Sequence, residues 1–335
     1  MNFGAVPVAD AIGAILAHSV RLEGRRLRKG LVLTAQDVAA LARDGHSEVT
    51  VARLAPQDCA EDEAAQRLAM ALVPDPEAAG IRLSAPFTGR VNIFAQGPCV
   101  ARFDTGRLLA LNQVDPMITL ATVPNYTQMT AGGMIATVKI ISYGVPDGAL
   151  DRACDLGRGA IEVAVPVFKN AGLIITDIAG GPGAKGADAI EARLQALGMA
   201  LHSTMIVPHR ISPLAEAISG CDAEMILILT GSATSDAMDV APEALRSAGG
   251  EVTRFGMPVD PGNLLFIGQI KGTEVIGLPG CARSLALNGA DWVLSRLACG
   301  LAVTSADIAS MGVGGLLKEI PSRPMPRARK PLQGA

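Results

Sequence analysis

Aromatic residues are scarce in this chain. They make up 3% of its 335 residues. Proteins that bind single-stranded nucleic acid stack bases on exposed aromatic rings, and the net charge of −3 adds no attraction for phosphate backbones. We therefore expect no nucleic-acid partner, and hydrophobic cores built from Ala, Leu, Val and Ile. The one basic, Pro-rich run, residues 323–330, is interpreted as a disordered tail, with an interaction arm as the alternative.

Several further signals are missing. The chain has no apolar run of the roughly 20 residues that span a bilayer, and MNFGAVPVADAI has no basic start before its apolar residues. Its six cysteines form no C-x-x-C pair, which argues against a zinc site or a disulfide framework. Its four histidines are scattered and it has no G-x-S-x-G motif, which argues against a Ser-His-acid triad. These absences predict a cytoplasmic protein in a reducing compartment, with no membrane partner.

The first region, residues 1–79, is expected to be a mixed α/β segment. Its apolar spacing predicts a helix over residues 6–20 and a second helix over 33–45, with Thr34 as N-cap. An alternating strand follows at 48–54. The run EDEAAQRLAMAL then predicts a helix with acidic residues in its first turn.

The second region, residues 80–147, is expected to be a small β-rich domain. Short runs such as GRVNIFA, GRLLALN and MIATVKIISYG are separated by Gly, Pro and Asn, which is typical of strands and turns. The punctuated stretch YGVPDGALDRA after it is interpreted as a linker.

The third region, residues 160–302, alternates strands and helices. Its strands, such as AGLIITDI and EMILILTGS, are nearly continuous apolar runs, as in strands buried on both faces. This pattern predicts a three-layer αβα domain with a mostly parallel sheet, ending in a long helix from Ala282 to Ala298. Residues 303–335 are expected to form a C-terminal extension with the basic tail.

Ligands of open parallel sheets bind beyond the carboxyl ends of the strands, and the loop after the first strand is one candidate. It reads TDIAGGPGAKGAD, from Thr176 to Asp188, and its glycines would let a ligand approach the backbone closely. It is not a P-loop, because Gly186 follows Lys185 where that motif requires Ser or Thr. The alternative is a flexible surface loop.

A second candidate is the loop LTGSATSDAMDVAPE. It turns at Gly231 and places Asp236 and Asp239 among small hydroxyl side chains. Such donors suit a phosphate group or another oxyanion, and a carboxylate could hold a magnesium ion or position water. The alternative is that Asp239 only N-caps the following helix.

The third candidate is GLPGCARS, residues 277–284. Its Leu-Pro-Gly step would expose the free N–H groups of a helix start to an anion, with Arg283 and Ser284 adding a cation and a hydroxyl. The alternative is a plain strand-to-helix turn. Cys281 would have a lowered pKa at a helix N-terminus, although the sequence offers it no evident His partner.

In this order, the three loops resemble the molybdopterin-binding domain shared by molybdopterin molybdenumtransferases and molybdopterin adenylyltransferases. TGSATSDAMD places Thr234 at the family's Ser and Asp239 at its final Asp. DPGNLLFIG supplies Pro261 and Gly262, and GLPGCARS supplies the Leu-Pro-Gly and the Ser of the family's last motif. The resemblance covers about residues 165–300, so the chain is expected to be a divergent member.

Four departures separate the chain from that family pattern. Ser232 and Asp236 replace glycines, Cys281 with Ala282 replaces Asn-Pro, and Asn263 stands where the family has a lysine. The missing lysine removes a cation that would neutralise phosphate. The resemblance therefore favours pterin binding over turnover.

The resemblance implies a set of site residues. The catalytic residues would be Asp239, Asp236 and Asp177. Asp239 and Asp236 would also bind a magnesium ion. Residues that would bind the pterin ligand are Gly180, Gly181, Gly183, Thr230, Gly231, Ser232, Thr234, Ser235, Pro261, Gly262, Pro279, Gly280, Cys281 and Ser284.

Three functions are compatible with this resemblance. The first is molybdopterin binding in molybdenum cofactor biosynthesis, with transfer of molybdate into adenylylated molybdopterin and Mg²⁺ as an aid. The second is a non-catalytic carrier acting with a separate nucleotidyltransferase or a molybdoenzyme. The third is a pyrophosphatase or amidohydrolase of the competence/damage-inducible family, whose second domain normally follows the ligand domain. The family analogy also implies a homodimer.

Overall fold

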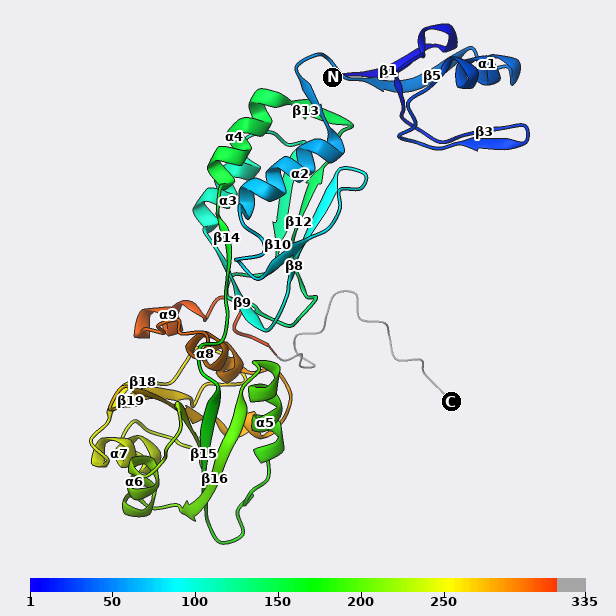
Figure 1. The fold of residues 1–335 in the computed structure, drawn as a ribbon. Helices are drawn as coiled ribbons and strands as arrows, with labels where there is room; N and C mark the ends of the chain where they lie inside the picture. The colour runs from blue at the N-terminus through cyan, green and yellow to red at the C-terminus, as the bar shows by residue number, and fades with distance from the viewer. Residues whose placement is uncertain (318–335) are drawn as a thin grey trace, which may run out of the picture. The chain divides into compact units, whose positions relative to one another are not determined.

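The computed structural model describes residues 1–317 (Figure 1). The chain divides into two compact units: Met1–Gly97 with Ala101–Val163, hereafter the N-terminal unit, and Pro98–Val100 with the residues from Ala164 onward, the C-terminal unit. The predicted boundary between residues 79 and 80 stays a prediction. The basic run at 323–330 lies outside the described residues.

Residues 1–164 contain small, mostly antiparallel sheets. The strand orders are β1-β5-β2, β3-β4, β13-β6, β10-β12-β8-β7 and β11-β9-β14. The strands are β1 (Asn2–Pro7), β2 (Ile15–Leu16), β3 (Val20–Leu22), β4 (Arg25–Leu27), β5 (Glu48–Arg53), β6 (Asp58–Ala60), β7 (Ile81–Leu83), β8 (Arg90–Ala95), β9 (Cys99–Phe103), β10 (Ile118–Thr122), β11 (Gln128–Met129), β12 (Met134–Ile140), β13 (Gly144–Pro146) and β14 (Ile161–Ala164). The helices are η1 (Val8–Asp10), α1 (Ala35–Arg43), α2 (Glu61–Leu72), α3 (Thr105–Asn112) and α4 (Asp147–Gly157).

The expected helix over residues 6–20 is wrong. The segment instead holds the end of β1, the short 3-10 helix η1, and β2, because β1 and β2 find backbone partners on the two sides of β5. The second expected helix is confirmed as α1. Its N-cap Thr34 and Asp37 form a reciprocal capping box.

Two other expectations fail in the β-rich region. GRLLALN belongs to helix α3, whose N-cap Asp104 accepts a hydrogen bond from the backbone N–H of Arg107 at 3.0 Å. The expected linker includes helix α4. Both helices bury a row of apolar residues that a short sequence window does not distinguish from a strand.

The C-terminal unit is built on a six-stranded sheet. The order is β16-β15-β17-β20-β19-β18, and β16, β15, β17 and β20 run parallel. Its strands are β15 (Asn170–Asp177), β16 (Ala200–Pro208), β17 (Met225–Leu229), β18 (Glu251–Phe255), β19 (Phe266–Ile270) and β20 (Thr273–Leu278). Only β19 runs in the direction opposite to the other five strands, so the prediction of a mostly parallel sheet is confirmed.

Helices cover both faces of this sheet and make three layers (Figure 1). Leu173 and Leu227 point into one core with α5 and α8, whereas Ile174 and Ile226 point into the other core with α6 and α7. This alternation is the period-two pattern of strands buried on both faces. The helices are α5 (Ala187–Ala196), α6 (Ile211–Ser219), α7 (Val240–Ser247), η2 (Gly280–Arg283), α8 (Gly289–Ala298) and α9 (Ser305–Ser310).

The expected last helix begins later than predicted. Residues 280–283 form the single 3-10 turn η2, and α8 begins only at Gly289. Asn288 is its N-cap and forms a capping box with Asp291. The segment 284–288 is therefore a loop, and the Leu-Pro-Gly step does not lead directly into a long helix.

Candidate functional site

The carboxyl ends of three parallel strands bring the predicted loops to one edge of the sheet. Ile175 in β15 pairs with Leu229 in β17, and Leu229 pairs with Leu278 in β20. The loops that leave these strands are residues 178–186, 230–239 and 279–288. The Gly-rich loop, the hydroxyl-rich loop and the Leu-Pro-Gly loop therefore emerge side by side, as expected for a ligand site of a parallel sheet.

A buried threonine joins two of these strands to a histidine. The Thr176 hydroxyl oxygen accepts the Gly231 N–H at 2.9 Å and lies 2.8 Å from His209 Nδ1. Thr176 is fully buried, so its hydroxyl group needs hydrogen-bond partners. His209 supplies one of them, and the tautomer of the imidazole sets which of the two atoms donates.

Sequence reasoning missed this contact. His209 follows β16 while Thr176 lies in β15, and the two come together because Thr176 pairs with Val207 in the parallel register. The two residues are 33 positions apart, and no motif in the sequence links them. The one signal that could have predicted their contact is that a polar residue stands at the end of each of two adjacent strands.

Gly231 is required where the second loop passes the end of β15. A Cβ at this position would lie 2.6 Å from the Thr176 carbonyl oxygen. On the two sides of Gly231, Thr230 and Thr234 are buried, and their hydroxyl oxygens lie 3.4 Å apart. Ser232 and Ser235 are exposed. Thus the threonines hold the loop and the serines face solvent.

Both acidic residues of this loop make local hydrogen bonds. Asp239 is the N-cap of α7 and accepts the N–H groups of Val240 at 2.7 Å and Ser235 at 2.9 Å. Asp236 accepts the Met238 N–H at 2.8 Å. The capping alternative is therefore observed for Asp239, and its catalytic role stays a prediction.

Arg283 joins the three loops. Its guanidinium donates to the carbonyl oxygens of Thr230 at 2.9 Å and of Gly183 at 3.4 Å, and also to that of Lys185. Gly186 has φ +101°, and a Cβ there would lie 2.8 Å from Arg283 Cα. Arg283 thus serves as a loop tie, whereas the sequence suggested it as a cation for an anion.

Arg193 in α5 holds the segment that follows Leu-Pro-Gly. Its side chain is 8% exposed and forms a 2.6 Å ion pair with Asp291 in α8. The remaining N–H groups donate to backbone carbonyl oxygens, namely those of Ala189 at 3.1 Å, Ala282 at 2.9 Å, Ser284 at 2.7 Å and Ala286 at 3.1 Å. The buried guanidinium of Arg193 thus holds the loop 284–288 through its bonds to Ser284 and Ala286.

The Pro-Gly step at 261–262 supports the start of α8. The Pro261 carbonyl accepts the Gly289 N–H at 2.9 Å, and a Cβ on Gly262 would lie 2.7 Å from the same nitrogen. The predicted pterin-binding role of Pro261 and Gly262 stays a prediction.

The remaining residues of the Leu-Pro-Gly loop have mixed environments. Pro279 N-caps η2, and the Ser284 hydroxyl accepts the Ala286 N–H at 3.2 Å. Cys281 is exposed, but desolvation by neighbouring groups raises the pKa of its thiol. The expected lowering of that pKa is wrong, because η2 is one four-residue turn and offers no long helix dipole.

Asp236 and Asp239 supply some, but not all, of the oxygen ligands that a magnesium ion needs. Asp236 and Asp239 are oxygen ligands of the kind Mg²⁺ prefers, and such sites usually add phosphate oxygens and water to one or two carboxylates. Among residues 1–317, no group of three or more His, Cys, Asp or Glu side chains is placed to hold a metal ion. A magnesium ion here would need the substrate's own oxygens.

Two family models match the chain, one in each of its two compact units. Residues 184–298 match the family model described as "Probable molybdopterin binding domain". The resemblance seen in the loop sequences is thereby confirmed for residues 184–298, which are similar to molybdopterin-binding domains. Residues 5–53 match a second model, described as a domain of unknown function. No curated protein matches the chain.

Two solved structures are similar to the chain. One is a molybdopterin biosynthesis MoeA protein from Pyrococcus horikosii, with 13% identity, a TM-score of 0.33, and coverage of 89% of this chain and 75% of that one. The other is a molybdenum cofactor biosynthesis protein from Pyrococcus furiosus, with 12% identity, a TM-score of 0.22, and coverage of 89% and 61%. The chain thus spans about three-fifths of the second protein's length. Within residues 1–317, no helix is long and apolar enough to cross a bilayer.

Proposed function

We propose that the C-terminal unit binds molybdopterin at the carboxyl edge of its sheet and serves molybdenum cofactor biosynthesis. The observation that supports this most directly is the convergence of three loops at that edge within a molybdopterin-binding domain. Arg283 ties the loops together before any ligand arrives. A preorganised site of this kind loses less conformational entropy on binding.

Polar groups at this edge suit a phosphorylated ligand. Ser232 and Ser235 are exposed on the second loop, and the imidazole of His209, just after β16, is a further polar group. Lys185 and Arg210 are exposed cations that follow β15 and β16. We propose that they neutralise the phosphate in place of the lysine that Asn263 replaces.

A second candidate function is delivery of the pterin to a nucleotidyltransferase or a molybdoenzyme without turnover. It is favoured by the engagement of both acidic residues of the second loop in backbone hydrogen bonds. In the catalytic alternative, these carboxylates with Asp177 would orient water or hold Mg²⁺ while molybdate enters the ligand. For either function we propose that the protein is cytoplasmic and forms a homodimer. Sedimentation of the full chain would test the homodimer.

One experiment tests both functions. The full chain is incubated with adenylylated molybdopterin, Mg²⁺ and molybdate, and pterin binding, nucleotide release and molybdenum content are measured. Asp239→Asn removes the charge but keeps an N-cap of similar strength. Asp222→Asn makes the same change at an exposed position before β17, at the opposite edge of the sheet, and is the matched control.

Each outcome has a distinct meaning. Loss of nucleotide release in Asp239→Asn, but not in Asp222→Asn, supports molybdate transfer. Saturable pterin binding without turnover in the unmodified protein supports delivery. Absence of pterin binding by a folded protein would refute the proposed function altogether.

A further inference from the structure

The hairpin formed by β3 and β4 in the N-terminal unit concentrates positive charge. Between Ser19 and Lys29 the sequence SVRLEGRRLRK has five cationic side chains and one carboxylate, in a chain whose net charge is −3. The hairpin lies within residues 5–53, which match a family model separate from the pterin-binding domain. The concentration of charge therefore belongs to a different module from the site described above.

The two strands place arginines directly opposite each other. Arg21 pairs with Arg26 across the hairpin, while the neighbouring pairs are Val20 with Leu27 and Leu22 with Arg25. Because side chains alternate between the faces of a strand, Leu22 and Leu27 enter the core and Arg21 and Arg26 share the outer face. Like charges directly opposite each other destabilise a strand pair, so this arrangement costs stability in the free protein.

No acidic side chain of the described residues offsets this repulsion. Within residues 1–317, none of the ion pairs or side-chain hydrogen bonds involves Arg21, Arg26 or the adjacent Arg28, all three of which are exposed. Arg25, on the other face, does have a partner: it contacts Asp37 of α1 at 2.7 Å. The outer-face arginines therefore keep their fork-shaped donors available for an external anion.

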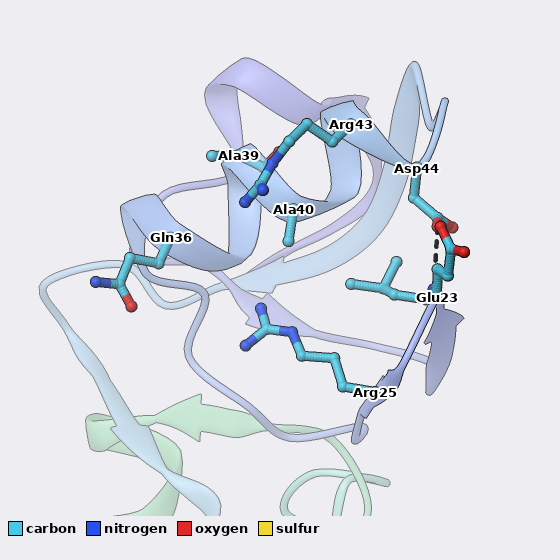
Figure 2. Close-up of a pocket in the computed structure, with 8 residues that line it drawn as sticks. Glu23, Arg25, Gln36, Ala39, Ala40, Arg43 and Asp44 are labelled. Carbon is cyan, nitrogen blue, oxygen red and sulfur yellow. Dashed lines mark hydrogen bonds between the residues drawn. The ribbon is translucent and has the colours of Figure 1, made fainter.

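The hairpin is also hollowed on both sides. One cavity of about 750 Å³ is lined by Ser19, Arg21, Leu22, Gly24, Arg25 and Arg26. The other, of about 700 Å³, lies between the hairpin and α1. Figure 2 shows Arg25 and Arg43 extending toward it from opposite sides, and the carboxylates of Glu23 and Asp44 line it as well. This second cavity is therefore of mixed charge, whereas the outer face of the hairpin carries arginines without an acidic partner among residues 1–317.

We propose that the outer face of this hairpin binds a short acidic segment of a partner protein. Arginine pairs carboxylates in a bidentate geometry, and the like-charge pair Arg21–Arg26 is relieved when a carboxylate lies between the two. A long polyanion such as nucleic acid fits less well, because the remainder of the chain is net negative and exposed aromatic rings are few.

The test uses fluorescence anisotropy of the full chain with a labelled decapeptide of glutamates. The hairpin variant is Arg21→Gln with Arg26→Gln. The control variant is Arg90→Gln with Arg152→Gln, which removes the same charge from two exposed positions elsewhere in the N-terminal unit. We expect saturable, salt-sensitive binding that weakens by about tenfold or more in the hairpin variant and by less than about twofold in the control.

A thermal melt keeps the result interpretable, because removal of the like-charge pair should leave the midpoint unchanged or raise it. Equal peptide binding by a folded hairpin variant would overturn the proposal, as would no saturable binding by the unmodified protein. Tighter binding of a short DNA duplex at the same salt concentration would overturn it in favour of a nucleic-acid surface. Pterin binding should be the same in all three proteins, so this test does not depend on the function of the C-terminal unit.

Discussion

The buried arginine of α5 gives the sharpest prediction for the C-terminal unit. Arg193→Met keeps much of the aliphatic stem but removes the guanidinium, leaving Asp291 without its ion pair and three carbonyl oxygens of the segment 282–286 without a donor. Breaking a buried pair by removing one partner costs about 3–5 kcal/mol. We expect a loss of unfolding free energy in that range.

The single tryptophan of the chain makes this loss measurable. Trp292 lies in α8 next to Asp291 and packs against the core that α8 shares with α5, so its fluorescence reports unfolding of the C-terminal unit. With a urea dependence of about 2–3 kcal/mol/M, the midpoint should fall by about 1–2.5 M.

A matched variant at the surface shows how much unfolding free energy an exposed ion pair contributes. Arg246 is about one-third exposed and pairs with Glu243 one helical turn away at 3.0 Å, so Arg246→Met should cost less than about 1 kcal/mol. If Arg193→Met were as stable as Arg246→Met, the reasoning that Arg193 holds the Leu-Pro-Gly segment in place would be refuted.

Three further predictions concern separate parts of the chain. Gly231→Ala should weaken pterin binding by about tenfold or more, because the added methyl group would meet the Thr176 carbonyl; unchanged binding in an equilibrium titration would contradict this. Hydrogen bonds from Thr34 lower the pKa of Asp37, so its ionised form stabilises the fold above the unfolded pKa of about 4, and this contribution is lost as pH falls through the lowered folded pKa. Calorimetry of Asp37→Asn should therefore show a lower melting temperature at pH 7 and a difference that shrinks toward acid pH. Burial raises the pKa of Cys299 to about 12, so thiol titration at about pH 8 should label exposed Cys281 first and Cys299 only after unfolding.

Local sequence signals were sufficient for the elements that depend on neighbouring residues. The apolar runs of β15, β17 and β20 predicted the parallel sheet, and Thr34 predicted the start of α1. They failed where a distant partner decides. Residues 6–20 have an apolar spacing that suits a helix, but parts of them form strands because β5 supplies backbone partners about 35 to 43 residues later.

The sequence by itself determined the strand-helix order of the C-terminal unit, and the motifs TGSATSDAMD and GLPGCARS predicted the similarity to molybdopterin-binding domains that residues 184–298 show. Only the tertiary structure decided what the side chains of these loops do. Arg283 donates to loop carbonyl oxygens, Arg193 holds a segment about 90 residues away, and Thr176 forms a hydrogen bond with His209 from the next strand. The physical reason is that a buried donor or acceptor must find a partner, and packing of the strands and helices determines which residue is near enough.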